Sequence, residues 1–115
     1  MRTLNDIIVP FYLSTVSTAG QVYVPVPDAG KVIKIVTALN GAIGTANAAI
    51  TTKINGTAIT GGAITIAYSG SAAGDVDSVV PTAANAVSED DVLEVETNGA
   101  STNAISVSGH FVIRR

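Results

Sequence analysis

The residue best suited to acid-base chemistry in this sequence is His110, the single histidine among 115 residues. Any Ser-His-Asp arrangement would have to use it as the general base. Ser108 and His110 alternate with Val107 and Phe111, a pattern that places His110 on the polar side of a strand. The chain also lacks the Gly-x-Ser-x-Gly turn that presents a serine nucleophile. We therefore expect His110 to be a strand surface residue and assign no catalytic residue.

Carboxylates in the second half of the chain are the candidates for binding a cation. Asp75 and Asp77 would point to the same side of an extended segment, and three more carboxylates follow at residues 89–91. Calcium binds several such oxygens at one point, but the Asp-x-Asp pair lacks the remaining ligands of a calcium loop. A histidine-rich metal site is excluded by the single histidine. We predict solvated turn residues here, with no metal and no cofactor.

Two further patterns bear on catalysis and on phosphate binding. Glu94 and Glu96 share one face of a predicted strand, as a glycosidase pair could, but neighbouring carboxylates on the wet side of a strand are ordinary. Residues 70–74 are small but lack the lysine and the spacing of a phosphate loop. Asn55 and Gly56 begin a possible glycosylation motif, although Asn-Gly between two strand patterns mainly indicates a hairpin turn. We predict that the protein is not an enzyme.

The distribution of charge argues against nucleic-acid and membrane binding. The formal net charge is −3, and no Lys or Arg occurs between Lys53 and Arg114. A nucleic-acid-binding domain normally shows a basic stripe with aromatic side chains. The uncharged residues 54–74 are too rich in Gly, Thr and Ser for a membrane span. The first six residues show no apolar export signal, so we expect neither export nor membrane contact.

The residue types predict a protein of many short strands. The chain contains 15 Val, 12 Ile and 13 Thr but only 4 Leu, and β-branched side chains favour strands over helices. Eleven Gly and four Pro interrupt the sequence at short intervals, as tight turns require. Alternating side chains predict about eight strands, at residues 7–16, 21–26, 31–39, 50–55, 63–68, 75–80, 91–97 and 105–114.

Individual strands carry signals for their place in a sheet. Pro10 predicts a bulge or an edge position for the first strand, and Pro25 predicts an edge position for the second. Residues 31–39 are apolar on both faces apart from Lys34, which predicts a central strand covered on each side. Eight such strands bury their apolar faces in a two-sheet sandwich or a small closed barrel. We predict one all-β domain, an antiparallel jelly-roll sandwich over residues 1–115, with residues 1–6 as a flexible arm.

Four segments, taken in order, resemble a known class of protein. They are Tyr-Val-Pro-Val-Pro-Asp-Ala-Gly-Lys (23–31), Lys-Ile-Asn-Gly-Thr-Ala-Ile-Thr-Gly-Gly (53–62), Gly-Ser-Ala-Ala-Gly-Asp-Val-Asp-Ser (70–78) and Asp-Val-Leu-Glu-Val (91–95). Their order is similar to that in small structural proteins of tailed bacteriophages, and closest to capsid decoration, or cement, proteins of the β-sandwich kind. The resemblance covers the chain from about residue 21 to the C-terminus.

The resemblance implies a function on the virion. Such proteins have a jelly-roll-like fold, are frequently trimers, and attach to the outer surface of the capsid between subunits of the major capsid protein. The chain would then be made in the host cytoplasm and located on the outside of the capsid. Position and charge alone make the following residues candidates for capsid contact: Met1, Arg2, Thr3, Leu4, Asn5, Asp6, Lys31, Lys34 and Arg114.

Two other classes of function stay open from the residues alone. A fibre-tip, lectin-like or tail-associated module would recognise a ligand on the host surface, but such modules usually sit in longer chains with repeats or stalks. Sugar-binding faces also need more aromatic stacking surface than two Phe and three Tyr supply. A small hydrolase or isomerase is the least favoured class, because no acid-base constellation is present. Adhesion to host cells without affinity for capsids would favour the recognition module.

Overall fold

The structure, a computed structural model, describes residues 4–115, and this part of the chain contains ten strands and no helix. Consequently it holds no helix of the length and apolar character that crossing a membrane requires. The strands are β1 (Asp6–Leu13), β2 (Gly20–Pro25), β3 (Gly30–Leu39), β4 (Ala48–Ile54), β5 (Thr57–Ala58), β6 (Ile64–Ile66), β7 (Val76–Val79), β8 (Ala86–Val87), β9 (Val92–Thr97) and β10 (Val107–Arg114).

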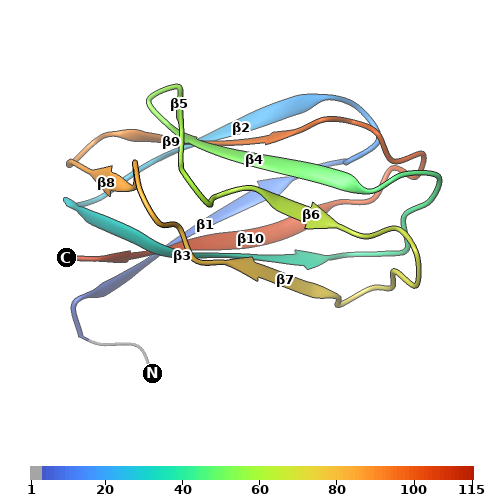
Figure 1. Ribbon diagram of the computed structural model, residues 1–115, viewed down its shortest axis with the longest axis horizontal. Helices are drawn as coiled ribbons and strands as arrows, with labels where there is room; N and C mark the ends of the chain where they lie inside the picture. Colours follow the sequence, from blue (N-terminus) through green and yellow to red (C-terminus); the bar gives the residue numbers. More distant parts are fainter. Residues whose placement is uncertain (1–3) are drawn as a thin grey trace.

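These strands form two antiparallel sheets that face each other (Figure 1). Sheet A has the order β1-β10-β3-β7, with β8 also paired to β3, and sheet B has the order β2-β9-β4-β5, with β6 also paired to β4. The pairs are nested along the chain, since the first strand pairs with the last, β2 with β9, β3 with β7 and β8, and β4 with β5 and β6. This is jelly-roll order. The predicted two-sheet sandwich is confirmed, and the two strands beyond the predicted eight, β5 and β8, have two residues each.

Proline positions agree with the edges of the sheets. β1 and β2 are edge strands, at the ends of sheets A and B. An edge strand tolerates a residue without an N–H donor, because its free side needs no ladder bond. The register of β1 with β10 runs without a shift from Asp6 to Leu13, so β1 has no bulge. The irregularity lies between β10 and β3, where Ile33 is the additional residue opposite Val112 and Ile113.

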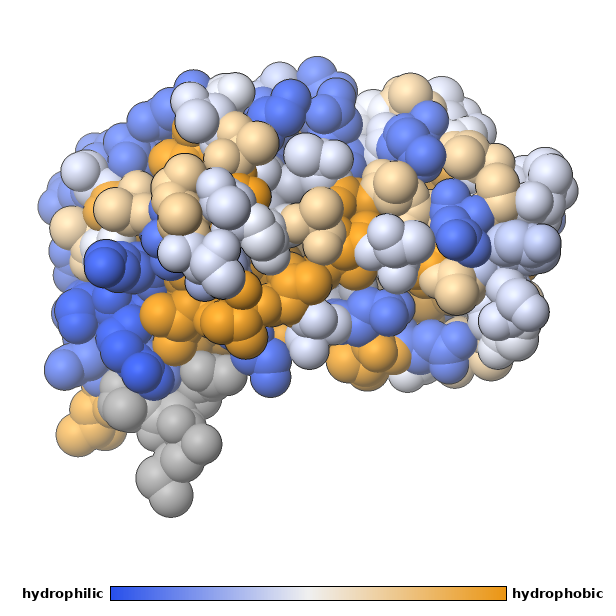
Figure 2. Space-filling model, viewed as in Figure 1, coloured by the Kyte–Doolittle hydropathy of each residue, from blue (hydrophilic) through white to orange (hydrophobic). Residues whose placement is uncertain are grey.

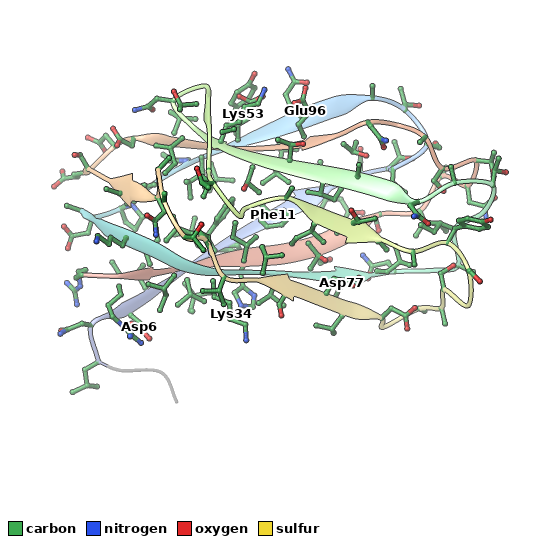
Figure 3. The ribbon with its side chains drawn as sticks, viewed as in Figure 1. Asp6, Phe11, Lys34, Lys53, Asp77 and Glu96 are labelled. Atoms are coloured by element: carbon green, nitrogen blue, oxygen red, sulfur yellow. The ribbon has the colours of Figure 1, made fainter. Side chains whose placement is uncertain are left out.

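The hydrophobic core fills the space between the two sheets. Alternate residues of β1 point inward, and Phe11 lies between the sheets in Figure 3. Its ring is 5.4 Å from the ring of Phe111 and tilted by 55°. The expectation that β3 is covered on both faces is wrong, because Val36 and Ala38 on its outer face are only partly buried. β3 is central within sheet A, but in residues 4–115 no further strand layer packs against the outside of that sheet.

Residues 80–85 connect β7 to β8 and tie the two sheets together. The N–H of Thr60, in the β5–β6 connection of sheet B, donates to the carbonyl of Ala83 at 3.1 Å, and the N–H of Thr82 donates back to Thr60 at 2.9 Å. On the sheet A side, the side-chain amide of Asn85 donates to the carbonyl of Val32 at 2.8 Å. The connection therefore supplies a hydrogen-bond partner for the backbone of β3 at a residue where neither β7 nor β8 pairs with it.

One residue of this connection carries conformational strain. Ala84 has a φ of 50°, in the left-handed region, and its side chain is exposed. Because a Cβ is unfavourable there, we expect Ala84→Gly to raise the free energy of unfolding by about 0.5–1 kcal/mol. The neighbouring Ala83 is also exposed and has no positive φ, so Ala83→Gly should lower stability instead. Urea unfolding of both variants checks the pair, and a loss of stability in Ala84→Gly would contradict the assignment of strain.

Candidate interaction surface

The outward side chains of sheet A form an ordered array, which we call the sheet A face. It arises because antiparallel pairing places residues side by side across β1, β10 and β3, and across the short strands β7 and β8 that pair with β3. The rows of the array, read across the strands, are Asp6–Arg114–Lys31–Ala86, Ile8–Val112–Lys34, Pro10–His110–Val36–Ser78 and Tyr12–Ser108–Ala38–Val76. One end of the face is thus charged, and the rest is mainly apolar.

Several large apolar side chains of this face are open to solvent. Ile8, Tyr12 and Val76 are 51%, 56% and 66% exposed. Beside Val76, residues of β10 and β3 that include Ser108, His110 and Ala38 line a shallow hollow of about 340 Å³. Figure 2, which views the sandwich from the side of β6 and β7, shows a further band of hydrophobic residues between the two sheets. Contiguous exposed apolar residues on a folded domain commonly mark a binding surface.

Three of the residues expected to contact the capsid lie at the charged end of this face. Arg114 pairs directly with Lys31 across β10 and β3, and Val112 pairs with Lys34. Lys31 and Lys34 are three positions apart and would face opposite sides of a regular strand. The additional residue Ile33 changes the alternation, so both lysines point outward while Val32 and Ile35 are buried.

The expected N-terminal arm differs from the observed structure at its inner end. Met1, Arg2 and Thr3 lie outside the described residues. Leu4 is 99% exposed. Asp6 belongs to β1 and not to an arm, and its carboxylate accepts hydrogen bonds from Nε and Nη2 of Arg114 at 2.8 and 3.1 Å. The Asp6 side chain is only 2% exposed, and its hydrogen bond and charge raise the pKa of Arg114.

Lys31 and Lys34 differ from the other Lys and Arg residues that the structure describes, because each of those others forms an ion pair with a carboxylate. Lys53 lies 3.2 Å from Glu96, Arg114 pairs with Asp6, and Arg115 lies 3.3 Å from Asp28. Within residues 4–115, neither Lys31 nor Lys34 has a hydrogen bond or ion pair from its ammonium group. Two unpaired ammonium groups therefore lie beside the apolar part of the sheet A face.

The opposite face, formed by the outward side chains of sheet B, is polar and internally paired. Lys53 and Glu96 project together from its outer side in Figure 3, whereas Lys34 projects away from sheet A. The hydrogen bond from Lys53 to Glu96 and the charge of that carboxylate raise the pKa of Lys53. The side-chain amide of Gln21 donates to the hydroxyl of Tyr23 at 3.2 Å. Two side-chain pairs of this face are thus formed within it, and its large exposed ring is that of Tyr23.

Carboxylates considered for a cation site cap turns instead. The N–H of Ala72 donates to Asp75 at 2.9 Å, and the N–H of Ser88 donates to Asp91 at 2.8 Å. The second bond, with a further hydrogen bond from Asn55, lowers the pKa of Asp91. Asp77 lies on β7 beside Thr37 of β3. Across residues 4–115, no group of three His, Asp or Glu side chains could hold a metal ion.

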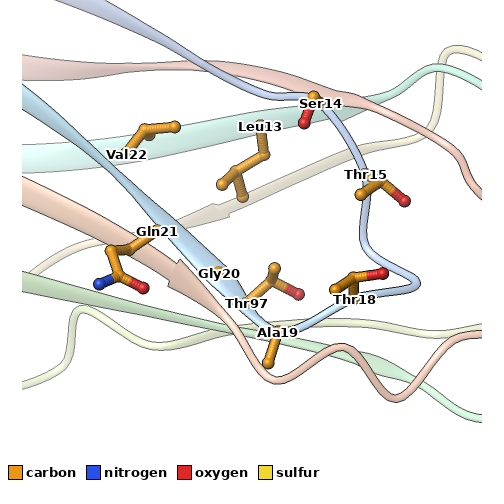
Figure 4. Close-up of a pocket in the computed structure, with 9 residues that line it drawn as sticks. All are labelled: Leu13, Ser14, Thr15, Thr18, Ala19, Gly20, Gln21, Val22 and Thr97. Carbon is orange, nitrogen blue, oxygen red and sulfur yellow. The ribbon is translucent and has the colours of Figure 1, made fainter.

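A second hollow lies where the chain turns from β1 to β2 (Figure 4). It encloses about 230 Å³ and is lined by hydroxyl, methyl and amide groups of residues 13–15, 18–22 and 97. None of these lining residues is charged or a histidine. The hollow therefore offers no side chain with the pKa of a general acid or base near neutral pH.

No protein-family model matches this sequence, and no curated protein sequence matches it significantly. The candidate surface is therefore assigned on geometry. It unites Lys31, Lys34 and Arg114, which the sequence pointed to, with His110, which the sequence placed on a polar strand face. Sequence reasoning missed the apolar members Ile8, Tyr12 and Val76, among others. Alternation alone could have placed Ile8 and Tyr12 opposite Val9 and Phe11, but it does not tell which of the two faces has no cover.

Proposed function

We propose that this protein is a structural virion protein that binds the outside of a tailed-phage capsid and bridges subunits of the major capsid protein. The observation that carries the proposal is the contrast between the two faces of the sandwich. One is mainly apolar and carries two unpaired lysines, and the other is more polar and holds two side-chain pairs of its own. A rigid domain with one such face is suited to attachment rather than to turnover. The four segments that resemble decoration proteins supply the identity of the partner.

Stabilisation would follow from mass action. A protein that binds only the assembled, expanded lattice lowers the free energy of that state, by about 2.7 kcal/mol per site at a free concentration one hundred times Kd. Bridging adds buried area across joints between subunits, which helps the shell resist the pressure of packaged DNA. Action as a homotrimer, as is frequent in the family resembled, is part of the proposal. No catalytic step is required.

The test is co-sedimentation with expanded, undecorated capsids of the phage that encodes the chain. We expect saturable binding at a fixed ratio to the major capsid protein, and a higher temperature of DNA release from filled heads. Light scattering of the free protein measures its mass. Failure to sediment with capsids, combined with adhesion to host cells, would overturn the proposal in favour of a host-recognition module.

A further inference from the structure

The sheet A face is suited to a particular kind of partner surface. Its apolar part is not flat, because Ser108 and Ala38 are small and leave a hollow beside Val76, which Val36 and His110 also line. A hollow of about 340 Å³ has room for one or two apolar side chains of a partner. Filling it would remove already exposed apolar surface from water, the main favourable term in association.

The charged end of the same face defines the second requirement. Lys31 and Lys34 both point outward, and within residues 4–115 neither contacts a carboxylate. The neighbouring Arg114 is already engaged by Asp6. An approaching carboxylate could therefore pair with a lysine without breaking an existing bridge. An uncharged polar partner would gain no such ion pair, and a basic partner would also meet cationic repulsion.

We infer that the sheet A face docks on an apolar segment of the capsid shell protein that carries a carboxylate beside it. The apolar side chain of that segment fills the hollow, and the carboxylate lies against Lys31 and Lys34. Sheet B then faces solvent. This inference rests on the proposed function, and it adds the docking face, the chemistry of the shell segment and the residues that select it.

The two faces offer matched variants for a capsid-binding test. Ala38 and Ala49 are both partly buried alanines, Ala38 on the outer face of β3 and Ala49 on that of β4. Ala38→Trp fills the hollow, and Ala49→Trp places the same ring on sheet B. The charge variants are Lys31→Gln with Lys34→Gln, and their control is Lys53→Gln on sheet B.

We expect Ala38→Trp and the double lysine variant each to weaken capsid binding about tenfold or more, while both sheet B variants bind as the unmodified protein does. Binding of the double lysine variant should also depend less on salt. Circular dichroism and thermal melting check folding, and the changes at the two outward-pointing lysines are expected to leave the fold intact. If the unmodified protein binds and both sheet A variants bind equally well, the docking face is wrong and the proposed function stands. If the unmodified protein does not bind, both proposals fail.

Discussion

Gly109→Val should lower the free energy of unfolding by about 3 kcal/mol or more, a shift of roughly 10–15 °C in Tm. Gly109 lies in β10, paired with Phe11 of β1 on one side and Thr37 of β3 on the other. A Cβ at this position would lie 2.3 Å from Cζ of Phe11 and 2.5 Å from the carbonyl oxygen of Val36. The phenyl ring could move only into the filled core, and the carbonyl belongs to the neighbouring strand. The added side chain would therefore clash with both groups, and neither can move away.

Gly20 provides the matched control for this substitution. It begins β2, has no positive φ, and a Cβ built on it meets no atom within 4 Å. Gly20→Val should therefore change stability by no more than about 0.5 kcal/mol. Thermal and urea unfolding of both variants give the comparison. Equal melting temperatures for Gly109→Val and the unmodified protein would contradict the close packing of Phe11 on β10.

Phe111→Ala should cost about 4 kcal/mol, because it removes the largest fully buried side chain of the core. Phe111 is 0% exposed, and its ring contacts that of Phe11. Truncation loses the burial of the ring and leaves a cavity between two sheets whose backbones are held by ladder hydrogen bonds. The sheets cannot close the gap without breaking their register, so little of the cavity should collapse.

Tyr12→Ala is the control for Phe111→Ala. Tyr12 lies in the neighbouring strand but points outward and is 56% exposed, so its truncation should cost less than about 1 kcal/mol. Denaturant unfolding measures both changes. Similar losses in the two variants would show that β1 and β10 do not divide inner from outer residues as described. The same two strands carry much of the sheet A face, so their packing also holds that face in shape.

Much of the architecture was predictable because a strand has a local period of two. Val9, Phe11 and Leu13 could be separated from Ile8, Pro10 and Tyr12 without any knowledge of the partner strand. Asn55 and Gly56 likewise predicted the β4–β5 hairpin, and both have the positive φ that such a turn requires. Composition also argued against helices, because each β-branched side chain favours a strand over a helix independently of distant parts of the chain.

Other features depended on contacts between segments far apart in the chain. The bulge at Ile33 appears only in the pairing of β3 with β10, and it turns Lys34 to the same side as Lys31. The capping roles of Asp75 and Asp91 depend on backbone groups of the folded turns. Asp6 was expected in an arm, but its bond to Arg114 joins the two ends of the chain and incorporates it in β1.

The sequence by itself determined the β class and most of the strands, and it contains no recognisable catalytic motif. Which side of each sheet faces the other, and which apolar side chains stay exposed, was decided only by the tertiary structure. The reason is physical: alternation divides a strand into two faces, but long-range pairing decides which face is buried and which residues of distant strands become neighbours.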